Sequence, residues 1–101
     1  MNTEVLDDPQ LPPLPAGWIY GPASWGECAI HAATGNLVRA VQNHIKGDPP
    51  IMYQTVHWKS PQADRSYAIR NCFNFMRGIE IVNAAIVAFE VEVRRRVREA
   101  V

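Results

Sequence analysis

The chain has 101 residues, of which 48% are hydrophobic and 20% are charged, and its formal net charge is zero. This composition excludes a disordered chain, and no apolar run approaches the ~20 residues that cross a bilayer. A protein of this size buries only about two thirds of the surface that its unfolded chain exposes. We therefore expect one small globular domain that gains stability from a partner surface.

The start of the chain lacks the basic and apolar regions of a signal peptide. Cys28 and Cys72 are the only cysteines, so the sequence implies no disulfide framework. In a reducing compartment both are expected to be buried thiols. Together these features predict a cytoplasmic protein without a membrane partner.

Charge is spread unevenly along the chain. Residues 1–27 hold four acids and no Lys or Arg, whereas residues 28–79 hold six bases and two acids. A local surplus of positive charge favours an anionic partner. The alternative is an ordinary solvated surface, which explains the same surplus without a ligand.

Residues 1–17 are predicted to form a flexible, proline-rich arm ahead of a single helical domain at residues 18–101. The arm holds four of the eight prolines, which remove backbone donors and favour an extended backbone. The aromatic cluster Trp18-Ile19-Tyr20 follows, and we expect it to pack against the helical hairpin and close one end. The alternative is that the cluster forms the lip of a ligand site.

A first helix is predicted near Ser24–Lys46. Ser24 and Glu27 have the spacing of a capping box, and apolar residues recur after them at helical spacing. Gly47 supplies a left-handed stop, and the prolines that follow end the segment.

The next segment, Ile51–Lys59, is ambiguous. Its β-branched and aromatic residues suggest a strand. A single strand, however, has nothing to pair with inside a monomer. Asp48 can cap a short helix that opens with Pro49 and Pro50, and we favour a helix here.

A long helix is predicted from Pro61 to about Arg98, with Ser60 as its cap. An apolar stripe then repeats in alternating steps of four and three residues. Its members are Phe75, Ile79, Val82, Ile86, Phe89 and Val93. Such a helix would be on the order of 55 Å long, more than the first helix alone can cover. The sequence thus predicts an all-α fold, an antiparallel helical hairpin that assembles into a homo-oligomer through this stripe.

Catalytic motifs are absent: there is no glycine-rich phosphate loop and no Gly-x-Ser-x-Gly. We expect no enzyme activity, no metal and no cofactor. One alternative makes Cys28 a nucleophile beside the expected helix N-terminus, with His57 as its base. Cys28 and His31 would also share a helix face as a weak zinc candidate, but a small core thiol is the favoured interpretation of Cys28.

A stretch of interleaved basic and aromatic residues carries the predicted ligand site. Rings stack on bases and guanidinium groups pair with phosphates, so the mixture suits a nucleotide, another anionic small molecule or an acidic protein surface. A helix N-terminus after Ser60 would add anion-attracting amides. The predicted ligand-binding residues are Tyr53, Trp58, Lys59, Arg65, Tyr67, Arg70 and Arg77. The alternative is that the rings are core anchors with the bases at their edge.

The basic end of the chain, Arg94–Arg98, does not predict nucleic acid as a partner. Acidic residues are interspersed with it, and bases near a helix C-terminus complement the helix dipole.

No motif identifies a family. Some counter-defence proteins of phages are helical-hairpin oligomers that sequester signalling nucleotides, and the pattern of this chain is broadly similar to that design. The similarity implies a small, non-enzymatic, oligomeric binding protein of a phage or another mobile element. A small Cys28-dependent enzyme and a purely structural adaptor subunit are the alternatives.

Overall fold

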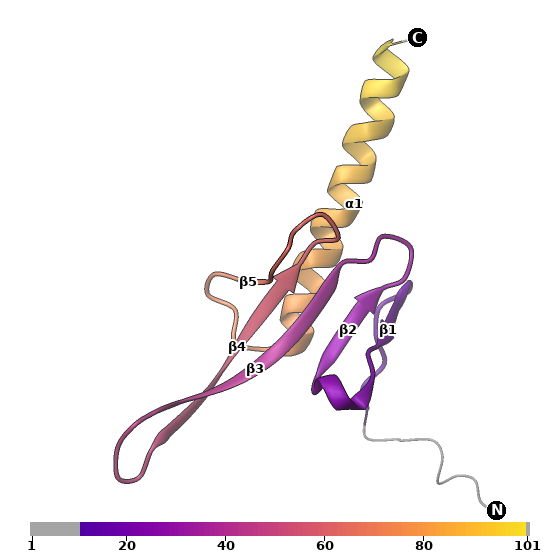
Figure 1. Ribbon diagram of the computed structural model, residues 1–101. Helices are drawn as coiled ribbons and strands as arrows, with labels where there is room; N and C mark the ends of the chain where they lie inside the picture. Colours follow the sequence, from indigo (N-terminus) through magenta and orange to yellow (C-terminus); the bar gives the residue numbers. More distant parts are fainter. Residues whose placement is uncertain (1–10, 101) are drawn as a thin grey trace, which may run out of the picture.

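A five-stranded antiparallel sheet with one C-terminal helix on its face forms the protein (Figure 1). The structure is a computed structural model, and it describes residues 11–100. The strands lie in the sheet in chain order. The elements are β1 (Trp18–Tyr20), the 3₁₀ turn η2 (Ala23–Trp25), β2 (Cys28–His31), β3 (Leu37–Ile45), β4 (Ile51–Lys59), β5 (Tyr67–Ala68) and α1 (Phe75–Ala100).

The predicted all-α helical hairpin is wrong, because most of its first arm and the segment after it are strands. β3 and β4 pair antiparallel along their whole length, from Leu37 with Lys59 to Ile45 with Ile51. Apolar residues four apart, such as Leu37, Val41 and Ile45, fit a strand as well as a helix, because four is also a multiple of the strand period. The ambiguous segment therefore is a strand, and β3 is the partner that it needs.

The predicted capping box begins no helix. Ser24 lies in η2, and Gly26 has a φ of 78°, a left-handed conformation that glycine adopts without steric cost. Gly35, with a φ of 82°, sits in the turn between β2 and β3, where its N–H donates to the His31 carbonyl at 2.7 Å. Both glycines therefore serve turns that connect strands.

α1 begins at Phe75, not at Pro61. Asn74 caps it, since its Oδ1 accepts a hydrogen bond from the backbone N–H of Arg77 at 2.9 Å. Ser60 and Pro61 open the loop to β5, a short strand that pairs with the end of β4. The first part of the predicted long helix is therefore loop and strand.

The first half of α1 packs on one face of the sheet and forms the core. Phe75, Ile79, Val82 and Ile86 of the apolar stripe are buried there. The sheet contributes Trp18, Ala29, Val38 and Val56 to the same cluster. Trp18 also ties β1 to the helix, because its Nε1 donates to the Asn83 Oδ1 at 2.9 Å.

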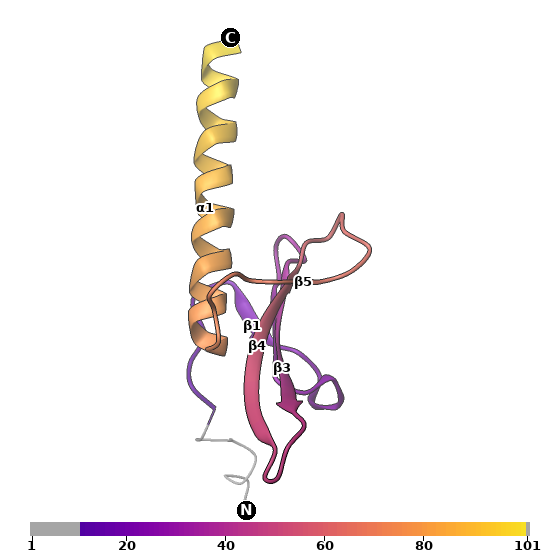
Figure 2. The ribbon, with the colours of Figure 1, turned by 90° about the vertical axis from the view of Figure 1, so that its left-hand side faces the viewer.

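The second half of α1 extends past the sheet into open space (Figure 2). Phe89 is 70% exposed, although it continues the stripe that is buried further down the helix. The hairpin of β3 and β4 extends from the opposite end of the sheet, so the molecule measures 62 Å along its longest axis (Figure 1).

Part of the predicted N-terminal arm is held on the domain. Leu14 packs against the core, and the Tyr20 hydroxyl donates to the Pro12 carbonyl at 2.5 Å. Residues 1–10 of the arm lie outside the described residues. No helix in the described part of the chain combines the length and apolar character that crossing a bilayer requires.

Candidate functional site

Because α1 covers one face of the sheet, the other face is open. Successive side chains of a strand point to opposite faces. Val38 and Val56 face the helix, so Arg39 and His57 face the open side. Cys28 is aligned with Arg39, and Arg39 with His57, so these residues form a row across β2, β3 and β4.

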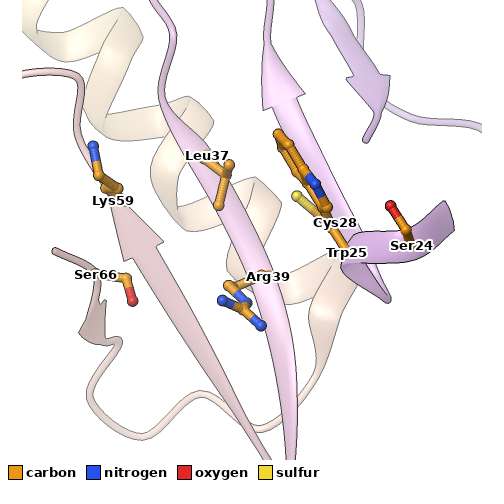
Figure 3. Close-up of a pocket in the computed structure, with 7 residues that line it drawn as sticks. All are labelled: Ser24, Trp25, Cys28, Leu37, Arg39, Lys59 and Ser66. Carbon is orange, nitrogen blue, oxygen red and sulfur yellow. The ribbon is translucent and has the colours of Figure 1, made fainter. Parts of the chain in front are cut away.

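A hollow of about 370 Å³ lies on this open face (Figure 3). We call it the open-face hollow; it is lined by Ser24, Trp25, Cys28, Leu37, Arg39, Lys59 and Ser66. Figure 3 shows Leu37 and Arg39 in its middle, with Trp25 and Ser24 of η2 on one side and Lys59 and Ser66 on the other. Trp25 is 52% exposed, so its ring is available to a ligand as one wall.

The polar groups of the open-face hollow are mainly hydrogen-bond donors. Arg39 and Lys59 make no ion pair with any residue between 11 and 100, and the Lys59 ammonium donates only to the Ser60 carbonyl, at 3.5 Å. Guanidinium and ammonium groups donate without accepting, and the hydroxyls of Ser24 and Ser66 can also donate. Among residues 11–100, no acidic side chain lines the hollow, so its electrostatics suit an anion.

Cys28 forms part of the floor and is only 2% exposed. Burial raises the pKa of its thiol, and the nearby Arg39 guanidinium opposes that rise only in part. Cys28 lies in a strand rather than at a helix N-terminus, so no helix dipole stabilises its thiolate. His57 is two strands away, about 10 Å at ~4.8 Å per strand, which is too far to take the proton.

The raised pKa of Cys28 predicts that the protein loses stability in alkali. The unfolded thiol ionises near its ordinary value of 9.0, whereas the folded thiol resists ionisation. Its contribution to the free energy of unfolding is therefore fully present below that pH and is lost as the pH rises through the folded pKa. We expect urea unfolding between about pH 8 and pH 11 to show this decline.

Cys28→Ser is the control for this experiment, because Tyr20 also has a raised pKa and is present in both proteins. The decline should be shallower in the Cys28→Ser protein. Alkylation of native Cys28 by iodoacetamide at pH 7 should be slow, as expected for a buried, protonated thiol. Equal slopes, or rapid alkylation of the folded protein, would contradict the prediction.

The residues predicted from the sequence to bind a ligand lie on both faces of the sheet. Lys59 lines the open-face hollow. Trp58, Tyr67 and Arg70 line a second hollow, of about 410 Å³, on the helix side. Trp58 packs against the core and its Nε1 donates to the Asn36 Oδ1 at 2.8 Å, so it also serves as an anchor.

The remaining predicted residues line neither hollow. The Arg65 guanidinium lies over the Tyr67 ring, 5.2 Å from its centroid, and its Nε donates to the Tyr67 hydroxyl at 3.3 Å. Arg77 pairs with Glu80 at 3.3 Å on the face of α1 that is exposed to solvent. Tyr53 lies on β4 towards the tip of the hairpin. The helix N-terminus expected after Ser60 does not exist.

Sequence reasoning missed Arg39, Trp25, Ser24 and Ser66. Arg39 lies within the helix predicted near Ser24–Lys46, and only the strand alternation of β3 shows that it faces away from the core. The sequence pattern predicts that Ser24 and Trp25 begin a helix. Gly26, directly after them, instead favours a turn. The pairing of β2, β3 and β4 assembles the site, and that pairing was not predicted.

The structure does not bring Cys28 and His31 together as zinc ligands. Cys28 and His31 are three residues apart in β2 and therefore point to opposite faces. His31 packs edge-on against Trp18, and its Nδ1 lies 2.8 Å from the Thr34 Oγ1. Within residues 11–100, no three side chains of His, Cys, Asp or Glu cluster as a metal site requires.

Comparison with family models, with curated proteins and with solved structures finds no match for this chain. The function is therefore argued from the geometry and the electrostatics of the site.

Proposed function

We propose that this protein is a non-enzymatic binding protein whose open-face hollow takes a small anion that carries a flat ring, such as a nucleotide. One observation carries the proposal. The cationic side chains of Arg39 and Lys59 line the same hollow as the half-exposed Trp25, and no acidic side chain of the described part of the chain lines it.

Each of these groups suits one part of such a ligand. The planar guanidinium of Arg39 can donate two parallel hydrogen bonds to a phosphate or carboxylate, and Lys59 adds a point charge. The indole ring of Trp25 offers a stacking surface, which favours a ligand with an aromatic ring. A volume of about 370 Å³ is at the lower end of the range typical of small-molecule sites.

Binding without catalysis is part of the proposal. Cys28 brings a thiol to the hollow, but its pKa is raised, and within residues 11–100 no general base lies next to it. We also infer a cytosolic location, which is supported by two buried cysteines that remain free thiols.

The test is a thermal-shift and calorimetric screen of nucleoside monophosphates and cyclic nucleotides, with inorganic phosphate and nucleosides as the two halves of the ligand. Arg39→Ala should weaken binding by tenfold to about a hundredfold, since a charge-assisted hydrogen bond contributes about 1.5–3 kcal/mol. Arg39→Lys should restore only part of the affinity, because an ammonium cannot make the bidentate contact. Trp25→Ala should weaken nucleotide binding more than phosphate binding.

Arg70→Ala is the matched control, because Arg70 lines the second hollow on the other side of the sheet. It should leave binding unchanged. If Arg70→Ala abolishes binding and Arg39→Ala does not, the ligand occupies the site that the sequence predicted. If no anion raises the melting temperature, neither site is used and a structural adaptor becomes the better proposal.

A further inference from the structure

The apolar stripe of α1 continues after the helix leaves the sheet. We call residues 87–100 the tail of α1. Phe89, Val93 and Val97 follow Ile86 in steps of three, four and four, so they lie on the helix face that is buried lower down. Along the tail these side chains are 70%, 42% and 58% exposed. The tail therefore presents an apolar face that nothing in the described part of the chain covers.

A hollow of about 740 Å³ lies at the base of the tail, where α1 leaves the sheet. Phe89 and Ala85 line it from the helix. Asn36 lines it from the connection between β2 and β3, and Pro61 from the connection between β4 and β5. Figure 2 shows the tail standing clear of the sheet above this point. A second helix lying on the apolar face would thus end in a preformed recess.

The charges of the tail indicate what that second helix is. Glu90 and Glu92 come first along the tail, and four arginines come after them, with Glu99 last. The arginines are Arg94, Arg95, Arg96 and Arg98. Two copies that run antiparallel and cross at residue 94 bring Glu90 opposite Arg98 of the second copy, and Glu92 opposite its Arg96. The Glu92 carboxylate already pairs with Arg95 and Arg96 of its own chain. The contact between Glu90 and Arg98 is therefore the opposite-charge pair that the dimer adds, and it occurs twice.

A parallel pair has neither advantage. Equivalent residues would face each other, so Glu90 would meet Glu90 and Arg98 would meet Arg98. The lower half of the second helix would also have to lie where the sheet already covers Ile79 and Val82. The charge pattern and the position of the sheet both select the antiparallel arrangement.

We propose that the tail of α1 docks antiparallel against the tail of a second copy of this chain, centred near Arg94. The tail is about 21 Å long at ~1.5 Å per residue, so the end of each helix reaches the hollow at the base of the other. Tails of this length bury less than the ~800 Å² per partner of a standard interface. The dimer should therefore be reversible and dependent on concentration. This proposal is independent of the ligand.

Val93→Glu and Val91→Glu form a matched pair that tests the face. Both valines lie in the tail and are exposed in the single chain, at 42% and 54%, but Val91 lies off the apolar stripe. Sedimentation velocity should show a dimer for the unmodified chain at high micromolar concentration and a monomer for Val93→Glu. Val91→Glu should remain dimeric. A monomeric unmodified chain, or equal behaviour of the two variants, would overturn the proposal.

Charge reversal tests the orientation. Glu90 and Arg98 make no ion pair within residues 11–100, so their substitution breaks no ion pair of the single chain. At low salt, Glu90→Arg should weaken dimerisation by about tenfold, because two attractive pairs become repulsive. Adding Arg98→Glu to the same chain should restore it. A parallel dimer would not be weakened by Glu90→Arg, so unchanged affinity in that variant would exclude the antiparallel arrangement.

Discussion

Gly78→Ala is expected to lower the free energy of unfolding by about 3 kcal/mol, although alanine is the better helix former by about 1 kcal/mol. A Cβ at residue 78 would lie 2.4 Å from the Cγ1 of Val56, and Val38 and Ile69 also approach it. Val56 and Val38 are completely buried, so neither can give way without disturbing the sheet. Gly78 is thus a point of close approach between α1 and the strands, and a methyl group there pushes the helix away from its core.

A double-mutant cycle with Val56→Ala tests this contact by urea unfolding. Val56→Ala alone removes buried methyl groups and leaves a cavity. In the double variant the new methyl group enters that space, so the combined loss should be smaller than the sum of the two by more than 1 kcal/mol. Ala88→Gly, at an exposed position of the same helix, reports the propensity difference by itself. Strictly additive losses would mean that the two residues do not touch.

The helix was easier to predict from the sequence than the sheet, and the spacing of apolar residues explains the difference. Phe75, Ile79 and Val82 are separated by four and three residues, and an odd step of three does not fit one face of a strand. In β3 the corresponding steps are four and four, from Leu37 to Val41 to Ile45, which both periods accommodate. A local pattern therefore identifies α1, although it predicts too early a start for the helix, and it cannot identify β3.

The wrong prediction of a helix near Ser24–Lys46 also leads to the wrong prediction for Ile51–Lys59. Ile51–Lys59 has the composition of a strand, and the sequence favours a helix there only as long as no partner strand is identified. The partner lies across a short turn, and the register between them depends on contacts that no single segment reveals. Strand pairing depends on segments that are separated in the sequence. The sheet can therefore be predicted only when all its strands are considered together.

The candidate site was predicted only in its chemistry. Positive charge beside aromatic rings is what the open-face hollow presents, but of the predicted residues only Lys59 lines it. Trp58 and Lys59 are neighbours in sequence and lie on opposite faces of β4, as the strand period requires. The predicted ligand-binding residues therefore lie on opposite faces of the sheet instead of in one cluster. The arginine that lines the open-face hollow is Arg39 on β3, whereas Arg70 lines the second hollow.

Ile79→Ala is expected to destabilise the protein by about 2–5 kcal/mol, the range seen when a large aliphatic side chain in a core is truncated. Ile79 is the largest of the completely buried side chains and belongs to the cluster that α1 forms with Val38 and Val56. A domain of this size has a total stability of only about 5–15 kcal/mol. A loss of 3 kcal/mol should then lower the melting temperature by roughly 12–24 °C, which differential scanning calorimetry would measure.

The dependence of this loss on protein concentration separates two roles for the apolar stripe. Ile79 is buried within the single chain, so the loss should be the same in dilute and concentrated samples. Val91→Ala, at an exposed position of the same helix, should change the melting temperature little. If the cost of Ile79→Ala grows with concentration, Ile79 is buried between chains and the packing of α1 on the sheet is wrong. A constant cost, together with a Val93→Glu variant that is monomeric but equally stable in dilute solution, would establish that the stripe has an inner half for folding and an outer half for association.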